Sequence, residues 1–270
     1  MKKTLAIQTF TKSHLPLVLC LLLTCTFLVG CCCINVGDIF KSEYKRTERS
    51  SSSITAGQVL DVHTDVGSIK IVGGDFTDCN VTAEITAKAA TEEKARTLAE
   101  ETKIKLESAG NMLRVVVEKP LKTKREAIFV SFNVTVPKQT PLNLGSNVGE
   151  MDIANITESI EAVTNVGKIN CRQITNKVNL TTNVGEISVS YAKDAPAACC
   201  ADISTDVGEI EFCGPDNLSA KVHVSANVGS IETHLPLTVI GKISKSLDGT
   251  VGNGQGRIAL RTSVGSISIR

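Results

Sequence analysis

A short motif returns seven times along this chain, and apolar residues alternate around it. Each copy has Asp, Asn or once Ser, then Val, Gly, a variable residue and Ile or Met. The side chains seven and five residues before each glycine are apolar. The residue three positions before the glycine is small, and the residue directly before it is Val. This period of two predicts a β-strand whose core face carries all four positions. The motif glycines are Gly67, Gly149, Gly167, Gly185, Gly208, Gly229 and Gly265.

The alternation shifts after each glycine. Apolar residues now fall two and four positions later, as in Ile69 and Ile71, although Ile231 is followed by Thr233. Such a shift indicates an extra residue at a bend, where glycine adopts φ > 0 freely. We expect the polar residues two positions before the glycine to stack as a hydrogen-bonded ladder, with calcium or sugar contacts as the alternative. They are Asp65, Asn147, Asn165, Asn183, Asp206 and Asn227.

The spacing of the motif predicts a mainly β fold, a β-solenoid of about seven rungs. Between Gly149 and Gly229 the glycines are 18, 18, 23 and 21 residues apart, as in stacked repeats. At about 3.3 Å per residue, an 18-residue rung measures about 60 Å around, which suits a flattened coil of two or three strands. Its inward side chains are numerous enough that we expect folding without cofactor, metal or disulfide.

An excursion separates Gly67 from Gly149. It predicts a strand over 80–87, a helix over 92–103 capped by Thr91, a hairpin of 104–108 with 113–118, and a strand over 128–136. Ala95, Leu98 and Ala99 would form the buried stripe of the helix. The final rung has an uncertain register because a glycine-rich loop over 249–256 precedes it.

This order of features resembles the bacterial putative-adhesin family of β-solenoid domains. The resemblance covers about residues 57–270 and rests on an opening rung, the helix and hairpin, a strand ending in Val136–Pro137, and rungs with a Gly-x-Ile turn. It implies an extracytoplasmic adhesin-like β-solenoid domain without catalytic residues. Within it, 72–138 would be a helix-bearing insertion near the N-terminal end and 139–270 the repeated rungs.

The first 30 residues are typical of a lipoprotein signal peptide. Lys2 and Lys3 precede an apolar run from Leu15 to Val29, which is shorter than the roughly 20 residues of a membrane-spanning helix. The run ends at Leu28-Val29-Gly30-Cys31, which matches a lipobox and implies cleavage before Cys31 and lipid on its sulfur. An uncleaved anchor helix is the alternative. The polar residues that follow predict a lipid anchor and flexible tether over 31–56.

Net charge and the positions of the cysteines limit which partners, disulfides and metal sites the chain can have. Without the three lysines of the signal peptide, 26 basic face 28 acidic side chains, a net charge of about −2. This balance argues against nucleic acid as a partner. Export would allow a disulfide, with Cys213 joined to Cys200 or Cys199 as the best candidates, and buried free thiols as the alternative. A zinc site is disfavoured because adjacent cysteines lack the usual ligand spacing.

The sequence contains no recognisable catalytic motif. His63 and His223 fall on outward strand positions, and His234 precedes a proline in an expected loop. Glu150, Glu186 and Glu209 follow turn glycines and read as solvated corner charges rather than a paired-carboxylate hydrolase site.

We therefore expect a non-enzymatic, membrane-anchored lipoprotein of the cell envelope that binds a surface or wall polymer or a protein. Cys32 after the lipidated residue favours the outer membrane in a Gram-negative cell. The alternative is a self-assembling envelope scaffold, a homo-oligomer joined through an uncovered strand at Ile267–Arg270. An envelope carbohydrate-active enzyme is the third hypothesis.

Overall fold

The computed structural model describes residues 41–236, 238–239 and 245–270. The described residues, from 41 onward, belong to one compact unit. The expected signal peptide, Cys31 and the first part of the expected tether lie outside the described residues.

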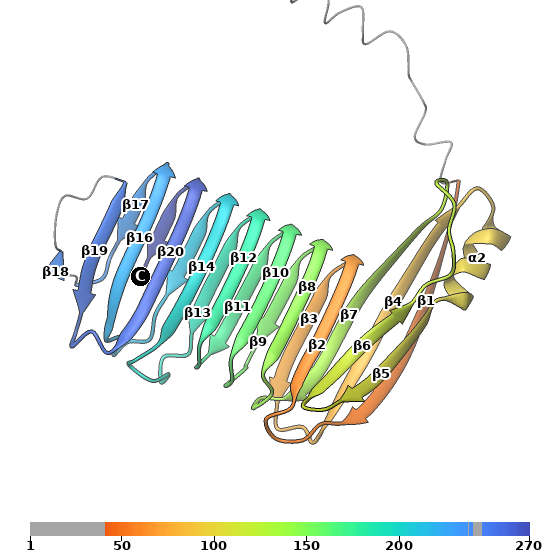
Figure 1. Ribbon diagram of the computed structural model, residues 1–270, viewed down its shortest axis with the longest axis horizontal. Helices are drawn as coiled ribbons and strands as arrows, with labels where there is room; N and C mark the ends of the chain where they lie inside the picture. The colour runs from red at the N-terminus through yellow and green to blue at the C-terminus, as the bar shows by residue number, and fades with distance from the viewer. Residues whose placement is uncertain (1–40, 237, 240–244) are drawn as a thin grey trace, which may run out of the picture. The chain divides into compact units, whose positions relative to one another are not determined.

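Two sheets build this unit, and its hydrophobic core lies between them (Figure 1). The first sheet contains, in spatial order, β1 (Ser42–Ser53), β4 (Asp78–Ala89), β7 (Ala127–Pro137), β3 (Ile69–Gly74), β9 (Met151–Ala154), β11 (Ile169–Ile174), β13 (Ile187–Tyr191), β15 (Ile210–Cys213), β21 (Ile267–Ile269) and β17 (Ile231–Thr233). The second sheet contains β18 (Thr238–Val239), β19 (Ser246–Val251), β16 (Ala220–Val228), β20 (Gly256–Val264), β14 (Cys200–Val207), β12 (Val178–Val184), β10 (Ile160–Val166), β8 (Leu142–Val148), β2 (Val59–Val66), β6 (Met112–Glu118) and β5 (Lys103–Ala109).

Each copy of the motif contributes one strand to each sheet, and its glycine lies at the corner between them. The copies stack in parallel and in register, so that Leu180 of β12 lies beside Ala162 of β10 and Ile203 of β14. The corner glycines lie against the neighbouring copy: a Cβ on Gly208 would come within 1.9 Å of the Gly185 carbonyl oxygen. Close stacking of backbone is therefore the reason that this position holds glycine.

The valine before each glycine lies outside the core, which corrects the expectation of a buried position. In β10, for example, Thr164 is buried whereas Asn165 and Val166 are both exposed. The chain begins to bend at the Asp or Asn that precedes the valine. The alternation of inward and outward side chains is therefore interrupted at that polar residue, and the valine points outward. Val148, Val166, Val184, Val207, Val228 and Val264 are 45–61% exposed.

The part of the expected tether that the structure describes is not a tether. Residues 42–53 form β1, a 12-residue edge strand that pairs antiparallel with β4 along its whole length. Its polar composition suits this place because an edge strand needs no second buried face, and its charges discourage pairing with other chains. Tyr44 and Ile54 still pack against the core.

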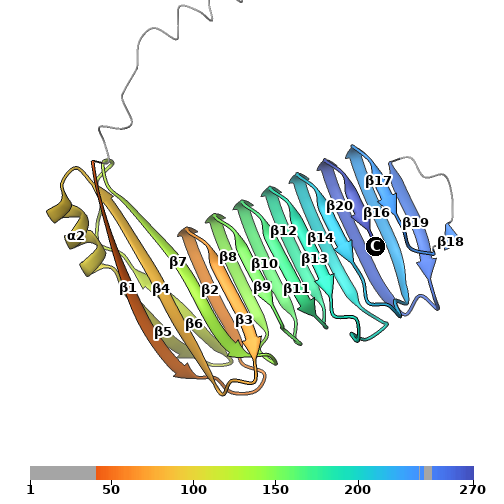
Figure 2. The same ribbon diagram turned by 180° about the vertical axis from the view of Figure 1, so that it is seen from behind.

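The helix and hairpin expected between the first two motif copies are present. Helix α2 (Glu92–Glu101) begins at Thr91, whose side-chain oxygen accepts a hydrogen bond from the Lys94 amide. Its buried residues are Ala95, Leu98 and Ala99, and it packs against β1 and β4 (Figure 2). The hairpin strands are β5 and β6, and β4 and β7 extend the first sheet.

The last copy of the motif does not lie at the end of the stack. Strand β20 pairs with β14 on one side and β16 on the other (Figure 1). In the first sheet, β21 lies between β15 and β17. The expectation of an uncovered strand at Ile267–Arg270 is therefore wrong. The antiparallel turn of the chain through β19 after β16 lets the final strands return into the gap. At this end the outermost strands of the described chain are β17 and β18.

Candidate functional site

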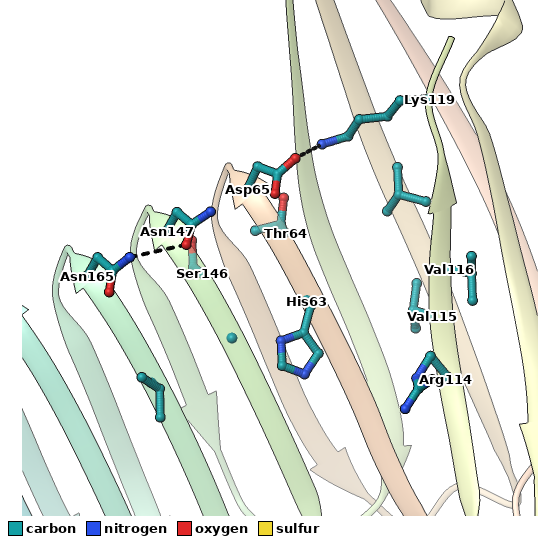
Figure 3. Close-up of a pocket in the computed structure, with 13 residues that line it drawn as sticks. His63, Thr64, Asp65, Arg114, Val115, Val116, Lys119, Ser146, Asn147 and Asn165 are labelled. Atoms are coloured by element: carbon teal, nitrogen blue, oxygen red, sulfur yellow. Dashed lines mark hydrogen bonds and ion pairs between the residues drawn. The ribbon is translucent and has the colours of Figure 1, made fainter. Parts of the chain in front are cut away.

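A groove opens in the second sheet where β2 and β6 separate. The two strands pair only as far as Val62 and Val115. Beyond that point β6 stays paired with β5, while β2 stays paired with β8 up to Val66. The strands therefore diverge and leave a cavity of about 530 Å³ (Figure 3). Its lining includes His63, Asp65, Arg114, Lys119, Gly145, Asn147, Val163 and Asn165.

A buried carboxylate lies beside the groove, where β2 and β6 are still paired. Asp61 is 2% exposed, and it accepts hydrogen bonds from Arg114 Nε at 2.6 Å and Asn143 Nδ2 at 2.8 Å. His63 Nε2 lies 2.8 Å from the same carboxylate. Because an ionised carboxylate can only accept, Nε2 carries the proton of this contact. Charge-assisted bonds of this kind fix both the guanidinium and the imidazole in place.

Gly145 makes room for the His63 ring. A Cβ on Gly145 would lie 2.1 Å from His63 Nδ1. Any other amino acid at position 145 would therefore push the imidazole away. The ring therefore lies against bare backbone. This close approach explains a glycine in a strand interior, where it normally weakens the strand.

The rim of the groove carries the polar residues that precede the corner glycines. Lys119 Nζ lies 2.6 Å from Asp65 Oδ2, and this contact is the main cause that lowers the pKa of Asp65 below its usual value. Asn165 Nδ2 donates to Asn147 Oδ1 at 3.2 Å, and Asn183 Nδ2 donates to Asn165 Oδ1 at 3.5 Å. Hydrogen bonds thus join three of the six expected ladder residues, and Asp65 binds a lysine instead.

The sequence pointed to only part of this site. Asp65, Asn147 and Asn165 were singled out as ladder residues, whereas Arg114 and Lys119 were not, because they come from the hairpin region of the excursion. The available signal was Gly145, an isolated glycine in an alternating strand, which indicates a close approach by another group.

The other described histidines, His223 and His234, do not line this groove. His223 on β16 is exposed and its Nδ1 lies 2.6 Å from Asp248 Oδ1. His234 lies in a loop after β17 and is exposed. Among the corner glutamates, Glu186 forms an ion pair with Lys168 at 3.0 Å. Within the described residues, no three His, Cys, Asp or Glu side chains gather as a metal site.

The described cysteines are free thiols, so the disulfide considered between Cys200 and Cys213 is not formed. Cys200 lies on β14 of the second sheet and Cys213 on β15 of the first sheet. In both strands the buried positions alternate with these cysteines, so the two thiols face outward from opposite sheets. Burial raises the pKa of Cys79 and Cys171 to about 12 and that of Cys199 to about 11.

These pKa shifts predict how the protein responds to thiol reagents and to alkali. Because Cys200 and Cys213 are partly exposed, we expect reagents to alkylate them first in the folded protein at pH 8, and to alkylate the buried thiols, whose pKa values are raised, only after unfolding. A thiol whose pKa rises on folding stabilises the folded state less as pH increases above its ordinary value of 9.0. The urea concentration at the midpoint of unfolding should therefore decrease as the pH is raised from 9 to about 12.

Mass spectrometry of alkylated peptides and urea titrations at several pH values check both parts. A variant with Cys79→Ala and Cys171→Ala should lose less stability with rising pH than the parent protein. Equal alkylation rates at all five described cysteines in the folded protein would contradict the buried placement.

Taken together, these observations define a mainly β repeat protein with an open groove in one of its two sheets. The chain belongs to the Toastrack family, DUF4097, whose profile matches residues 41–270. In the part of the chain that the structure describes, no helix has the length and apolar character needed to cross a membrane. Among curated proteins, none matches the sequence.

Solved structures resemble this fold. A putative cell adhesion protein from Clostridium sporogenes is 12% identical, with a TM-score of 0.51, over 83% of this chain and 99% of that chain. A putative adhesin from Bacteroides fragilis is 17% identical, with a TM-score of 0.44, over 83% of this chain and 97% of that chain. At 12% identity the likeness to the Clostridium sporogenes protein concerns the fold alone.

Proposed function

We propose that this protein is a lipid-anchored binding module of the bacterial cell envelope that acts without catalysis. The groove between β2 and β6 is the observation that supports this role most strongly. It brings fixed polar side chains from β2, β6, β8 and β10 around one open cavity. The adhesion-related name of the similar Clostridium sporogenes protein agrees with a surface-binding role.

The chemistry of the groove suits binding better than hydrolysis. A general acid–base pair needs one carboxyl or imidazole free to exchange its proton with a substrate. Here Asp61 is covered by Arg114, His63 and Asn143, and Asp65 is paired with Lys119. His63 contacts Asp61 through Nε2 only, but among the described residues the groove lining offers its other ring nitrogen no uncommitted carboxyl or second imidazole as a partner in acid–base catalysis. These side chains hold each other in place, as the fixed contacts of a recognition site do.

Anchoring through lipid on Cys31 completes the proposal. The lipobox Leu28–Cys31 places the acylated residue ten positions before Lys41, where the described domain begins. The folded domain would therefore stay close to the membrane surface and present its sheets to the envelope.

Metabolic labelling tests the anchor. The full chain, expressed in a bacterial host with an alkyne-bearing fatty acid, should carry the label and partition into detergent. Cys31→Ser should abolish both, because the thioether forms only on cysteine sulfur. Equal labelling of Cys31→Ser and the parent chain would overturn lipidation at this residue.

Retention on envelope fractions tests binding. Residues 41–270, purified as a soluble domain, should bind saturably to intact cell-wall or outer-membrane fractions. The domain starts at residue 41 because β1 belongs to the first sheet. Protease treatment of the fraction distinguishes a protein partner from a polysaccharide. Retention that never saturates, or that heat-denatured domain reproduces, would overturn a specific binding role.

A further inference from the structure

We propose that the groove between β2 and β6 is a carbohydrate subsite that binds one or two rings of an uncharged glycan chain. This inference rests on the proposed binding function and names its ligand class. The argument uses the balance of charge in the groove, the type of its polar groups, and its size.

The cations of the groove are already neutralised by fixed carboxylates. Arg114 Nε lies 2.6 Å from Asp61 Oδ2, and Lys119 Nζ lies 2.6 Å from Asp65 Oδ2. The lowered pKa of Asp65 keeps its side chain ionised at neutral pH, which preserves this compensation. An anionic ligand would have to compete with carboxylates for each cation, whereas an uncharged ligand leaves both pairs intact.

The remaining polar groups both donate and accept hydrogen bonds over a short stretch. Asn147 and Asn165 offer amide N–H groups and carbonyl oxygens, and Asp65 offers carboxylate oxygens beside them. A sugar hydroxyl is itself both donor and acceptor, so it matches such a mixed set of planar groups. The stacking of Asn147 on Asn165 orients these amides before any ligand arrives, which lowers the entropic cost of binding.

The interior of the groove combines this polar rim with apolar surface. Val116 and His63 line it (Figure 3) together with the exposed Val163. The C–H face of a sugar ring can lie against such a surface while its hydroxyls reach the rim. The volume of about 530 Å³ falls within the roughly 300–1,000 Å³ of small-ligand sites.

An extended peptide fits the same opening less well. It would add a strand between the diverging edges of β2 and β6. The ion pair of Lys119 with Asp65 spans that gap, since Lys119 follows β6 and Asp65 lies on β2. A peptide strand would have to break this pair, whereas a sugar ring resting over the sheet would not.

The repeat supplies a matched pair of variants for the test. Asn147→Ala removes a rim amide of the groove, and Asn227→Ala removes the residue at the same motif position in a distant copy. Both asparagines are exposed, so both variants should fold like the parent domain. A second groove variant, Asn165→Ala, guards against a local effect of the first.

The experiment titrates neutral oligosaccharides of hexoses, N-acetylhexosamines and pentoses into residues 41–270, with NMR and calorimetry as readouts. Acidic and phosphorylated oligosaccharides and short peptides, each at low and high salt, are the comparison ligands. We expect at least one neutral oligosaccharide to shift the amide signals of His63, Asn147 and Asn165. Asn147→Ala and Asn165→Ala should each weaken the affinity for that oligosaccharide about five- to tenfold, whereas Asn227→Ala should leave this affinity unchanged.

Three results would overturn this subsite. The first is that no class of oligosaccharide binds. The second is an equal loss of affinity in Asn147→Ala and Asn227→Ala. The third is a salt-sensitive preference for phosphorylated or acidic glycans or for peptides. If envelope retention persists in Asn147→Ala while the oligosaccharides fail, the binding function stands and only the subsite is rejected.

Discussion

Gly208→Ala is expected to lower the free energy of unfolding by about 2–6 kcal/mol. Gly208 has φ +151, a conformation that costs a non-glycine residue about 1–3 kcal/mol. An alanine Cβ would also lie 1.9 Å from the Gly185 carbonyl oxygen, so the two motif copies must separate. Forced separation of packed groups costs a further 1–3 kcal/mol or so. Urea unfolding of residues 41–270, followed by circular dichroism, measures the change.

Gly110→Ala is the matched control for this measurement. Gly110 turns the hairpin of β5 and β6 with φ +59, and an added Cβ would meet nothing within 4 Å. It therefore carries the backbone cost of about 1 kcal/mol without a clash. A loss in Gly208→Ala no greater than that in Gly110→Ala would contradict the close stacking of the corner glycines.

Local features of the fold were predictable from the sequence. The alternation around the motif predicted strands on both sides of each glycine, and Thr91 followed by Glu92 and Glu93 predicted a helix start. Each of these predictions depends only on residues that are close together in the chain: the apolar alternation within one strand, or the cap and first turn of one helix. The structure places β-strands and α2 accordingly.

Features that depend on distant segments were not predictable. The polar sequence 42–53 has no apolar alternation, and it forms a strand only because β4 offers an edge along 12 residues. The position of the final copy depends on how the chain turns back through β19, which no local pattern encodes. The valines before the glycines follow strand parity in sequence, but the bend of the corner turns them outward.

The groove shows the same division. Its rim comes from the repeat, so Asp65, Asn147 and Asn165 were visible as motif positions. Its closed end joins β2 to the hairpin, through Asp61 and Arg114, which lie 53 residues apart. Such a contact requires the register between β2 and β6, and this register exists only once the sheet has formed.

Deletion of residues 256–270 is expected to unfold a segment that precedes them in the chain. Those residues form β20 and β21, which lie between β14 and β16 and between β15 and β17. Without them, β16 keeps only its antiparallel partner β19, and buried residues such as Val222 and Val224 lose the neighbouring strand. A hairpin of two strands is at best marginally stable in water. The amides of 220–228 should therefore lose their protection, with an opening free energy near zero.

Amide hydrogen exchange and limited proteolysis of residues 41–255, beside residues 41–270, measure this effect. In the truncated chain we expect early cleavage between 216 and 255, whereas β8, β10 and β12 keep their protection because their partners remain. If the copies were stacked in chain order, removal of the last one would take away only an end rung, and β16 would stay protected against β14. Retained protection over 220–228 would therefore contradict the inserted position of the final copy, because repeat stability depends on contacts between adjacent units.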